Sequence, residues 1–312
     1  LGPVWLTLPD GREVQPFAVA PWSGDSPAAL EELPPILRSL RGDFPCVPFG
    51  APAPRSDMPA HWSRGVDMSA TPLDGFVHGY GANHLWELEH LSHREVRVFI
   101  DYTDSHPVRR VTRRITPIDG PGLSIDLSIE MRRDTELPIG LHPIFALPDQ
   151  PGSARLEIPS LRSVRSFPVP VEPGSILRPD QKARTLSELV TLDNRLLDLT
   201  NLPLDAHTEE LLSVLPDEGK ATLVRLDRGY AVTLDWDVEV FPHCLLWLSN
   251  AGRDAYPWNS RFRALGIEPV CSVFDLGQAV SGSPSSPFAR DGVPTRVRLT
   301  TKQPFRTGYS IS

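Results

Sequence analysis

Proline limits the fold of this 312-residue chain more than any other feature, because 34 prolines are spread along its length. Each proline lacks a backbone N–H donor and stops an α-helix, so long helices have little room. Together with 22 glycines, the prolines favour many short strands joined by tight turns. No internal repeat and no central low-complexity linker divides the chain. We therefore predict a single all-β domain over residues 1–312.

The clearest strand signal is the alternation over residues 123–131, where Leu, Ile and Met occupy one face and Ser, Asp and Glu the other. A turn at 119–122 follows a β-branched stretch at 111–117, which predicts a hairpin. Residues 221–226 and 230–237 repeat this arrangement around a short Asp-Arg-Gly turn. Successive hairpins of this kind favour antiparallel sheets.

Four more strands are expected, at residues 96–101, 244–249, 267–274 and 295–300. Helices are expected to be minor. Ser26 before Pro27 is typical of a helix N-cap, and residues 209–215 predict two helical turns.

Charge and cysteine content exclude several classes of partner. The net charge of −8 does not favour nucleic acid or anionic lipid, and no apolar stretch approaches the roughly 20 residues of a membrane span. Cys46, Cys244 and Cys271 are scattered singly, so they indicate neither a disulfide framework nor a metal-ligand spacing. With no secretory signal visible at the start, we predict a cytoplasmic protein, leaving open a trimmed leader.

Familiar catalytic motifs are absent from the sequence. It contains no phosphate-binding loop, no dinucleotide fingerprint, no HExxH and no GxSxG. His84, His90 and His93 lie close together, but no acidic or thiol partner follows at ligand spacing. We therefore predict no metal site.

Three segments place an ionisable group within apolar, turn-flanked sequence. His78 precedes Gly79 and Gly81, which allow close approach of the backbone. His142 lies in the apolar stretch LPIGLHPIFAL, and Glu268 lies between Ile and Pro in LGIEPV. A buried carboxylate without a partner has a raised pKa, which suits acid–base chemistry. Taken singly, each segment also fits a core residue or a loop crossing a sheet end.

Four motifs, in this order along the chain, resemble the aldose 1-epimerase or galactose-mutarotase-like superfamily, which includes hexose-6-phosphate 1-epimerase-like proteins. They are RGDFPCVPFG at 41–50, HGYGANHLWEL at 78–88, LHPIFAL at 141–147 and LGIEPV at 265–270. The resemblance covers nearly the whole chain. It implies a large antiparallel β-sandwich with a few short helices and a sugar bound on a concave sheet face.

The resemblance also implies roles for individual residues. Glu268 would take the proton of the anomeric hydroxyl, His142 would protonate the ring oxygen, and His78 would hydrogen-bond the sugar beside it. The remaining candidates would contact the sugar: Arg41, Asn83, Trp86 and Trp247. The implied reaction needs neither cofactor nor metal.

Departures from the family pattern bear on the substrate. Ile144 stands where the family usually has a tyrosine after His-Pro. Residues 80–83 read Tyr-Gly-Ala-Asn where the phosphate-binding members have an arginine, which favours an unphosphorylated sugar or sugar derivative. Asp205 and Asp235 are the candidates for the family's active-site aspartate.

The leading interpretation is an isomerase that interconverts the anomers of a small-molecule carbohydrate. A carbohydrate-binding or regulatory protein with the same cleft is one alternative, because a fold does not fix a function. A glycoside lyase or hydrolase using the same His and Glu is another. The oligomeric state is left open between monomer and homodimer.

Overall fold

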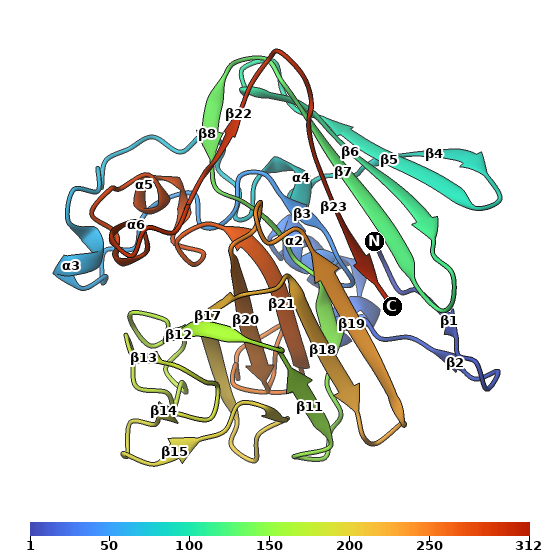
Figure 1. Ribbon diagram of the computed structural model, residues 1–312, viewed down its shortest axis with the longest axis vertical. Helices are drawn as coiled ribbons and strands as arrows, with labels where there is room; N and C mark the ends of the chain where they lie inside the picture. Colours follow the sequence, from blue (N-terminus) through green and yellow to red (C-terminus); the bar gives the residue numbers. More distant parts are fainter.

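A computed structural model describes residues 1–312 and consists mainly of two large antiparallel sheets (Figure 1). This confirms the predicted all-β class, a large antiparallel β-sandwich with a few short helices. From edge to edge, the first sheet has nine strands: β16 (Asn201–Leu202), β11 (Ala154–Glu157), β18 (Lys220–Arg225), β19 (Tyr230–Trp236), β23 (Phe305–Ile311), β7 (Leu123–Met131), β6 (Val108–Pro117), β5 (Glu95–Asp101) and β4 (Glu87–Ser92).

The second sheet has eight strands and carries the segments that matter for function. Its order is β13 (Lys182–Ala183), β12 (Leu161–Ser166), β17 (Thr208–Pro216), β20 (His243–Asn250), β21 (Arg263–Cys271), β9 (Ile139–Leu141) and β3 (Pro45–Cys46), with β10 (Ile144–Ala146) also pairing with β21. Three short pairs lie outside these sheets: β1 (Leu6–Thr7) with β2 (Glu13–Val14), β14 (Leu189–Val190) with β15 (Leu196–Leu197), and β8 (Thr135–Leu137) with β22 (Val297–Leu299).

The helices are all short, as the proline content predicts. They are η1 (Pro21–Gly24), α1 (Pro27–Glu31), α2 (Pro35–Arg38), α3 (Ala60–Ser63), α4 (Tyr80–Asn83), α5 (Gly277–Ser281) and α6 (Pro287–Arg290). The Ser26 side chain accepts a hydrogen bond from the Ala29 N–H at the start of α1, so the predicted N-cap is present. No helix is long and apolar enough to cross a membrane.

Most predicted strands appear where the alternation placed them. Strand β7 has the bounds predicted for it, and β5, β6, β18, β19 and β20 include nearly all of the residues expected for them. The strand expected at 267–274 begins earlier, at Arg263, and ends at Cys271. The last one is shorter, because β22 covers only Val297–Leu299.

The helix predicted over residues 209–215 is wrong, because these residues belong to strand β17. This strand pairs with β12 on one side and β20 on the other, and nearly all of its side chains are buried. A strand buried on both faces loses the polar–apolar alternation that marks a half-exposed one, so periodicity alone cannot identify it.

The main core fills the space between the two large sheets. Ile125, Leu127 and Ile129 on β7 belong to the same buried cluster as Leu212 on β17 and Leu246 on β20. Each sheet therefore contributes its apolar face to one shared core, as in other face-to-face sandwiches.

A buried ion pair joins the segment before β3 to the nine-stranded sheet. Asp43 is fully buried, and Arg113 on β6 is only 2% exposed. The Arg113 guanidinium donates to the Asp43 carboxylate and to its backbone carbonyl, and the Tyr309 hydroxyl on β23 donates to the same carboxylate at 2.7 Å. Because a buried charge is costly without a partner, these residues hold one another in place.

Replacing one member of this pair tests its importance. We expect Arg113→Met to lower the free energy of unfolding by about 3–5 kcal/mol, because Asp43 is left buried without a counter-charge. The matched control is Arg114→Met, its neighbour on the exposed face of β6, which pairs with Glu95 in solvent and should change stability little. Urea unfolding of both variants measures the difference, and equal losses would contradict a structural role for the buried pair.

Candidate active site

The register of the eight-stranded sheet places His142 opposite Glu268. Strand β21 pairs with β9 through Val270 and Gly140, and with β10 through Gly266 and Ile144. Position 142 lies midway between Gly140 and Ile144, and position 268 lies midway between Gly266 and Val270. The Ile267 N–H donates to the Pro143 carbonyl at 3.0 Å and continues the pairing between them. Two residues 126 positions apart in the sequence thus become cross-strand neighbours.

The two side chains lie close together and away from solvent. The His142 Nε2 and Glu268 Oε1 atoms are 3.5 Å apart, and the residues are only 5% and 3% exposed. Gly266 makes room for the carboxyl, because a Cβ atom at that position would overlap Glu268 Oε1. The pair lines a cavity of about 220 Å³, large enough for a single sugar ring.

Aromatic rings fix the His142 imidazole. Phe44 stacks on it with ring centres 4.6 Å apart, and His78 meets it edge-on at 5.1 Å. Trp247 on β20 lies at 5.9 Å and lines the same cavity. The His142 N–H donates to the Phe44 carbonyl at 2.9 Å, so the segment before β3 supports the ring and its backbone together.

Burial drives both members of the pair toward their neutral forms. Loss of water lowers the pKa of His142 to about 3, and it raises the pKa of Glu268 well above its ordinary value, with further repulsion from the Asp275 carboxylate. Burial also lowers the pKa of His78 well below its ordinary value. Over a wide pH range the His142–Glu268 pair therefore holds one proton, which is what paired acid–base chemistry requires.

His78 is held by a turn with an unusual backbone. Its φ is 59° and that of Gly79 is 80°, both in the left-handed region. The His78 N–H donates to the Gly50 carbonyl at 2.8 Å, and the Gly50 N–H donates to His78 Nδ1 at 3.3 Å. Since Nδ1 accepts, the proton of the neutral ring is on Nε2 and is free to donate to a ligand.

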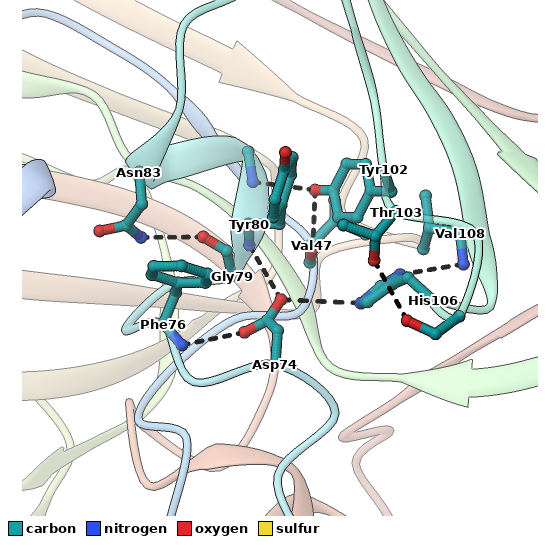
Figure 2. Close-up of polar contacts among 12 residues, drawn as sticks. Val47, Asp74, Phe76, Gly79, Tyr80, Asn83, Tyr102, Thr103, His106 and Val108 are labelled. Atoms are coloured by element: carbon teal, nitrogen blue, oxygen red, sulfur yellow. Dashed lines mark hydrogen bonds and ion pairs between the residues drawn. The ribbon is translucent and has the colours of Figure 1, made fainter.

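A polar network supports this turn through the residues around Gly79 and Tyr80 (Figure 2). The Asp74 carboxylate accepts from the Phe76 and Tyr80 N–H groups, and His106 Nε2 lies 3.6 Å from it. The Tyr102 hydroxyl donates to the Val47 carbonyl at 2.8 Å and accepts from the Gly81 N–H at 3.3 Å. The network links the His78 turn to β3 and to the nine-stranded sheet.

The cavity includes polar residues that the motifs did not indicate. Arg253 and Asp275 line it beside Trp258, and the Asp275 Oδ1 atom is buried without a hydrogen-bond partner. The Arg253 guanidinium lies 4.4 Å from the Trp258 ring centre, and it pairs with Glu209 at 3.3 Å. Both Arg253 and Asp275 follow the ends of strands, in loops with no local signature.

Glu209 supports the cavity wall from β17. Its carboxylate accepts from Trp247 Nε1 at 2.7 Å and from the Ser249 hydroxyl at 3.1 Å. Burial raises its pKa to about 7, against the opposing attraction of Arg253. The sequence analysis missed Glu209 because it assigned residues 209–215 to a helix. On strand β17 the Glu209 side chain instead meets Trp247.

The structure brings together His78, His142, Trp247 and Glu268 in the cavity, and it places the other predicted contacts elsewhere. Arg41 and Trp86 line a separate hollow of about 410 Å³, and Ile36 of α2 borders both spaces. The Asn83 amide donates to the Val77 and Gly79 carbonyls at 2.8 and 2.9 Å, closing the His78 turn.

The two candidates for an active-site aspartate also lie outside the cavity. Asp205 is exposed in a loop before β17, and Asp235 is on β19 of the other sheet, 3.8 Å from Lys220. No group of three or more His, Cys, Asp or Glu side chains is arranged to hold a metal ion.

Comparison with solved structures defines the fold class. The chain superposes on the GalM/aldose epimerase homologue from C. elegans with a TM-score of 0.62 and 12% identity, covering 100% of this chain and 91% of that one. A galactose mutarotase-like protein from Lactobacillus casei gives 0.58 and 15%, with 97% and 90% covered. The Slr1438 protein from Synechocystis gives 0.60 and 14%, with 96% and 84% covered.

The chain therefore has the galactose-mutarotase-like fold. No protein-family model matches the sequence, and no curated protein matches it either.

Alanine at Gly79 tests how tightly the His78 turn is held. A Cβ atom there would lie 2.6 Å from the Val47 carbonyl oxygen, whereas one at Gly120, which also has positive φ, would meet nothing within 4 Å. We expect Gly120→Ala to cost about 1–2 kcal/mol for the left-handed backbone alone. Gly79→Ala should lose about 1–3 kcal/mol more from the clash, as measured by urea unfolding. Equal losses would show that the turn has room to move.

Proposed function

We propose that this protein is an aldose 1-epimerase-like isomerase that interconverts the anomers of an unphosphorylated sugar or sugar derivative. The observation that carries the proposal is the buried, facing pair of His142 and Glu268 in a cavity the size of one sugar ring. The fold supports it by analogy, because solved structures with this fold are named as aldose epimerase or mutarotase homologues.

The proposed reaction needs one base and one acid. The Glu268 carboxylate takes the proton of the anomeric hydroxyl, the C1=O1 double bond forms, and the bond between C1 and the ring oxygen breaks. The ring oxygen takes a proton from His142 Nε2. Rotation about the C1–C2 bond then presents the other face of the aldehyde, and the same two groups run the steps in reverse. Glu268 and His142 carry every proton transfer in these steps, so the proposed reaction uses neither cofactor nor metal.

The protonation of the pair fits this cycle. Burial favours the neutral pair in the empty cavity, with the proton on Glu268. A bound sugar donates its anomeric O–H to Glu268 and accepts from His142, so it stabilises the alternative in which the proton is on His142. In this proposal His78 hydrogen-bonds the sugar through Nε2 on the side of His142, and Trp247 offers an apolar ring face for its C–H groups.

Turnover can be followed directly by optical rotation. We expect the protein to accelerate the mutarotation of fresh α-D-glucose or α-D-galactose over buffer, and His142→Ala or Glu268→Gln to lower kcat by about 10²- to 10⁴-fold. His90→Asn and Glu218→Gln are matched surface controls and should retain full activity.

The same assay distinguishes the alternatives. No acceleration with any common aldose would contradict the proposal. Sugar-dependent quenching of Trp247 and Trp258 fluorescence without turnover would favour a carbohydrate-binding protein. Intact turnover in Glu268→Gln would contradict the base assignment while leaving the activity standing.

The pH dependence of kcat/KM should reflect one proton shared by the pair. We expect a plateau from the lowered His142 pKa of about 3 up to the raised pKa of Glu268. Below the plateau both groups are protonated and no base remains; above it neither is protonated and no acid remains. The rate is measured after subtracting the buffer rate at each pH.

A fall in rate as pH drops through about 6.5, the ordinary histidine value, would contradict the shared-proton description. Glu209 has its own pKa of about 7, so Glu209→Gln is the control for an inflection there.

A further inference from the structure

A second hollow adjoins the cavity at its tryptophan end. It has a volume of about 500 Å³, and Arg253 and Trp258 line both spaces. The rings of His142, Trp247 and Trp258 follow one another with centres 5.9 and 6.1 Å apart, so they lead from the His142–Glu268 pair to the hollow. The Arg253 guanidinium lies against Trp258 at this junction, 4.4 Å from the ring centre.

The loop between β20 and β21 forms most of the hollow, and it has a fixed, strained backbone. The φ angles of Ala251, Asn259 and Ser260 are 58°, 46° and 51°, in the left-handed region that residues other than glycine seldom adopt. The Ala251 N–H donates to the Phe262 carbonyl at 2.9 Å, and the Ser260 N–H donates to the Arg253 carbonyl at 2.7 Å. Strain of this kind persists only where surrounding contacts hold it, and it gathers at ligand sites.

Tyr256 presents an exposed aromatic ring from this loop. It lines the hollow and is 46% exposed, although a ring of this size gains free energy when it is covered. Because the loop is already ordered, a ligand that covers the ring pays little entropy to fix it. The ring therefore offers an apolar face, ready to pack against the C–H groups of a sugar.

The rest of the lining can exchange hydrogen bonds with hydroxyl groups. Its polar side chains, apart from Arg253, include both acceptors and donors: Glu172, His207, Asp254 and Ser260. A sugar hydroxyl both donates and accepts, so it can pair with either kind.

The same lining disfavours other classes of ligand. Arg253 is its only arginine or lysine, and it is already paired with Glu172 at 3.0 Å and Glu209 at 3.3 Å. A phosphate or carboxylate would therefore meet carboxylates without a free cation. Apart from Tyr256 and Trp258, the apolar lining is limited to alanine, glycine and proline, which offer little surface to an alkyl chain.

We propose that this hollow binds a second sugar ring, so that the preferred substrate is a reducing disaccharide. The inference rests on the proposed function, because it places C1 and the ring oxygen of the first ring at Glu268 and His142. C3 and C4 form the opposite edge of that ring and point away from the pair. A second ring linked at O4 extends past Trp258 and packs on Tyr256.

Disaccharides with a free anomeric carbon test the inference. We compare the mutarotation of cellobiose and maltose, which carry a second glucose on O4, with that of D-glucose, each started from a single anomer and corrected for the buffer rate. We expect kcat/KM for at least one disaccharide to exceed that for glucose by about three- to tenfold, the gain from one aromatic contact. Equal values, or slower turnover of both disaccharides, would overturn the inference and leave the isomerase activity intact.

Tyr256→Ala tests whether the hollow causes the preference. Tyr256 does not line the cavity, and its exposure means that the fold should tolerate the change. We expect the variant to abolish the disaccharide preference and to leave kcat/KM for glucose unchanged. The matched control is Trp5→Ala, an aromatic residue that is 67% exposed and lines neither space, and it should change neither value. An unchanged preference in Tyr256→Ala, or an equal loss with all three sugars, would contradict the placement of the second ring.

Binding without turnover separates the two proposals. Quenching of tryptophan fluorescence by glucose, cellobiose and maltose is measured on the wild type and on Tyr256→Ala, because Trp258 lines both spaces. If the wild type turns over none of the three sugars, the proposed function fails. Tighter binding of a disaccharide that Tyr256→Ala abolishes would then still support the second sugar site, and equal binding of all three sugars would overturn it.

Discussion

The buried pairing of Asp43 with Arg113 is the contact on which the position of His142 depends. Arg113 and Tyr309 belong to the nine-stranded sheet, and Asp43 precedes β3 of the other sheet, so the pair fixes one sheet against the other. The residues on both sides of Asp43 hold the segment that carries His142. The Phe44 carbonyl accepts from the His142 backbone N–H, and the Gly42 carbonyl accepts from the Ile144 N–H. A buried ion pair adds little net stability, but an unpaired buried charge is very costly. The placement that pairs Asp43 with Arg113 also stacks Phe44 on the imidazole.

Strand register does the rest of the positioning. The pairings of β21 with β9 and β10 set His142 opposite Glu268 without any contribution from a flexible loop. Residues on strands are located to within a fraction of an ångström by the ladder of backbone hydrogen bonds, which is the precision that proton transfer needs. His78 differs, since it lies on a turn, and the turn accordingly carries the extra supports of Asp74, Tyr102 and Asn83 (Figure 2).

Prediction from the sequence succeeded where local pattern and structure coincide. Alternation identified β7 and β19 because one face of each is wet, and it failed at β17, which is buried on both faces. The motifs located His78, His142 and Glu268, whose neighbours are fixed by strand and turn geometry. They could not locate Arg253 or Asp275, because each reaches the cavity from a loop after a strand, through contacts between distant segments. Arg41 and Trp86 belong to the predicted motifs, but their side chains line a separate hollow. Ile36 borders both this hollow and the cavity. The roles of all these residues stay predictions, and so does the single domain over residues 1–312.

Ile144, where the sequence departs from the family that it resembles, and the aliphatic residues that line the cavity depend on the same N-terminal segment. Ile144 is fully buried in a cluster with Trp22, Leu33 and Leu40, which come from the N-terminal segment that includes α2. A tyrosine hydroxyl in that cluster would need a hydrogen-bond partner among mainly apolar neighbours, and the Trp22 Nε1 group already donates to the Leu37 carbonyl. The segment that excludes a polar residue at position 144 is therefore the same one that presents Ile36 and Leu37 to the cavity. Covering the sheet with this segment also keeps water from the His142–Glu268 pair, which is the cause of both pKa shifts. The same N-terminal segment thus shapes the lining of the cavity and favours the shared proton of the His142–Glu268 pair.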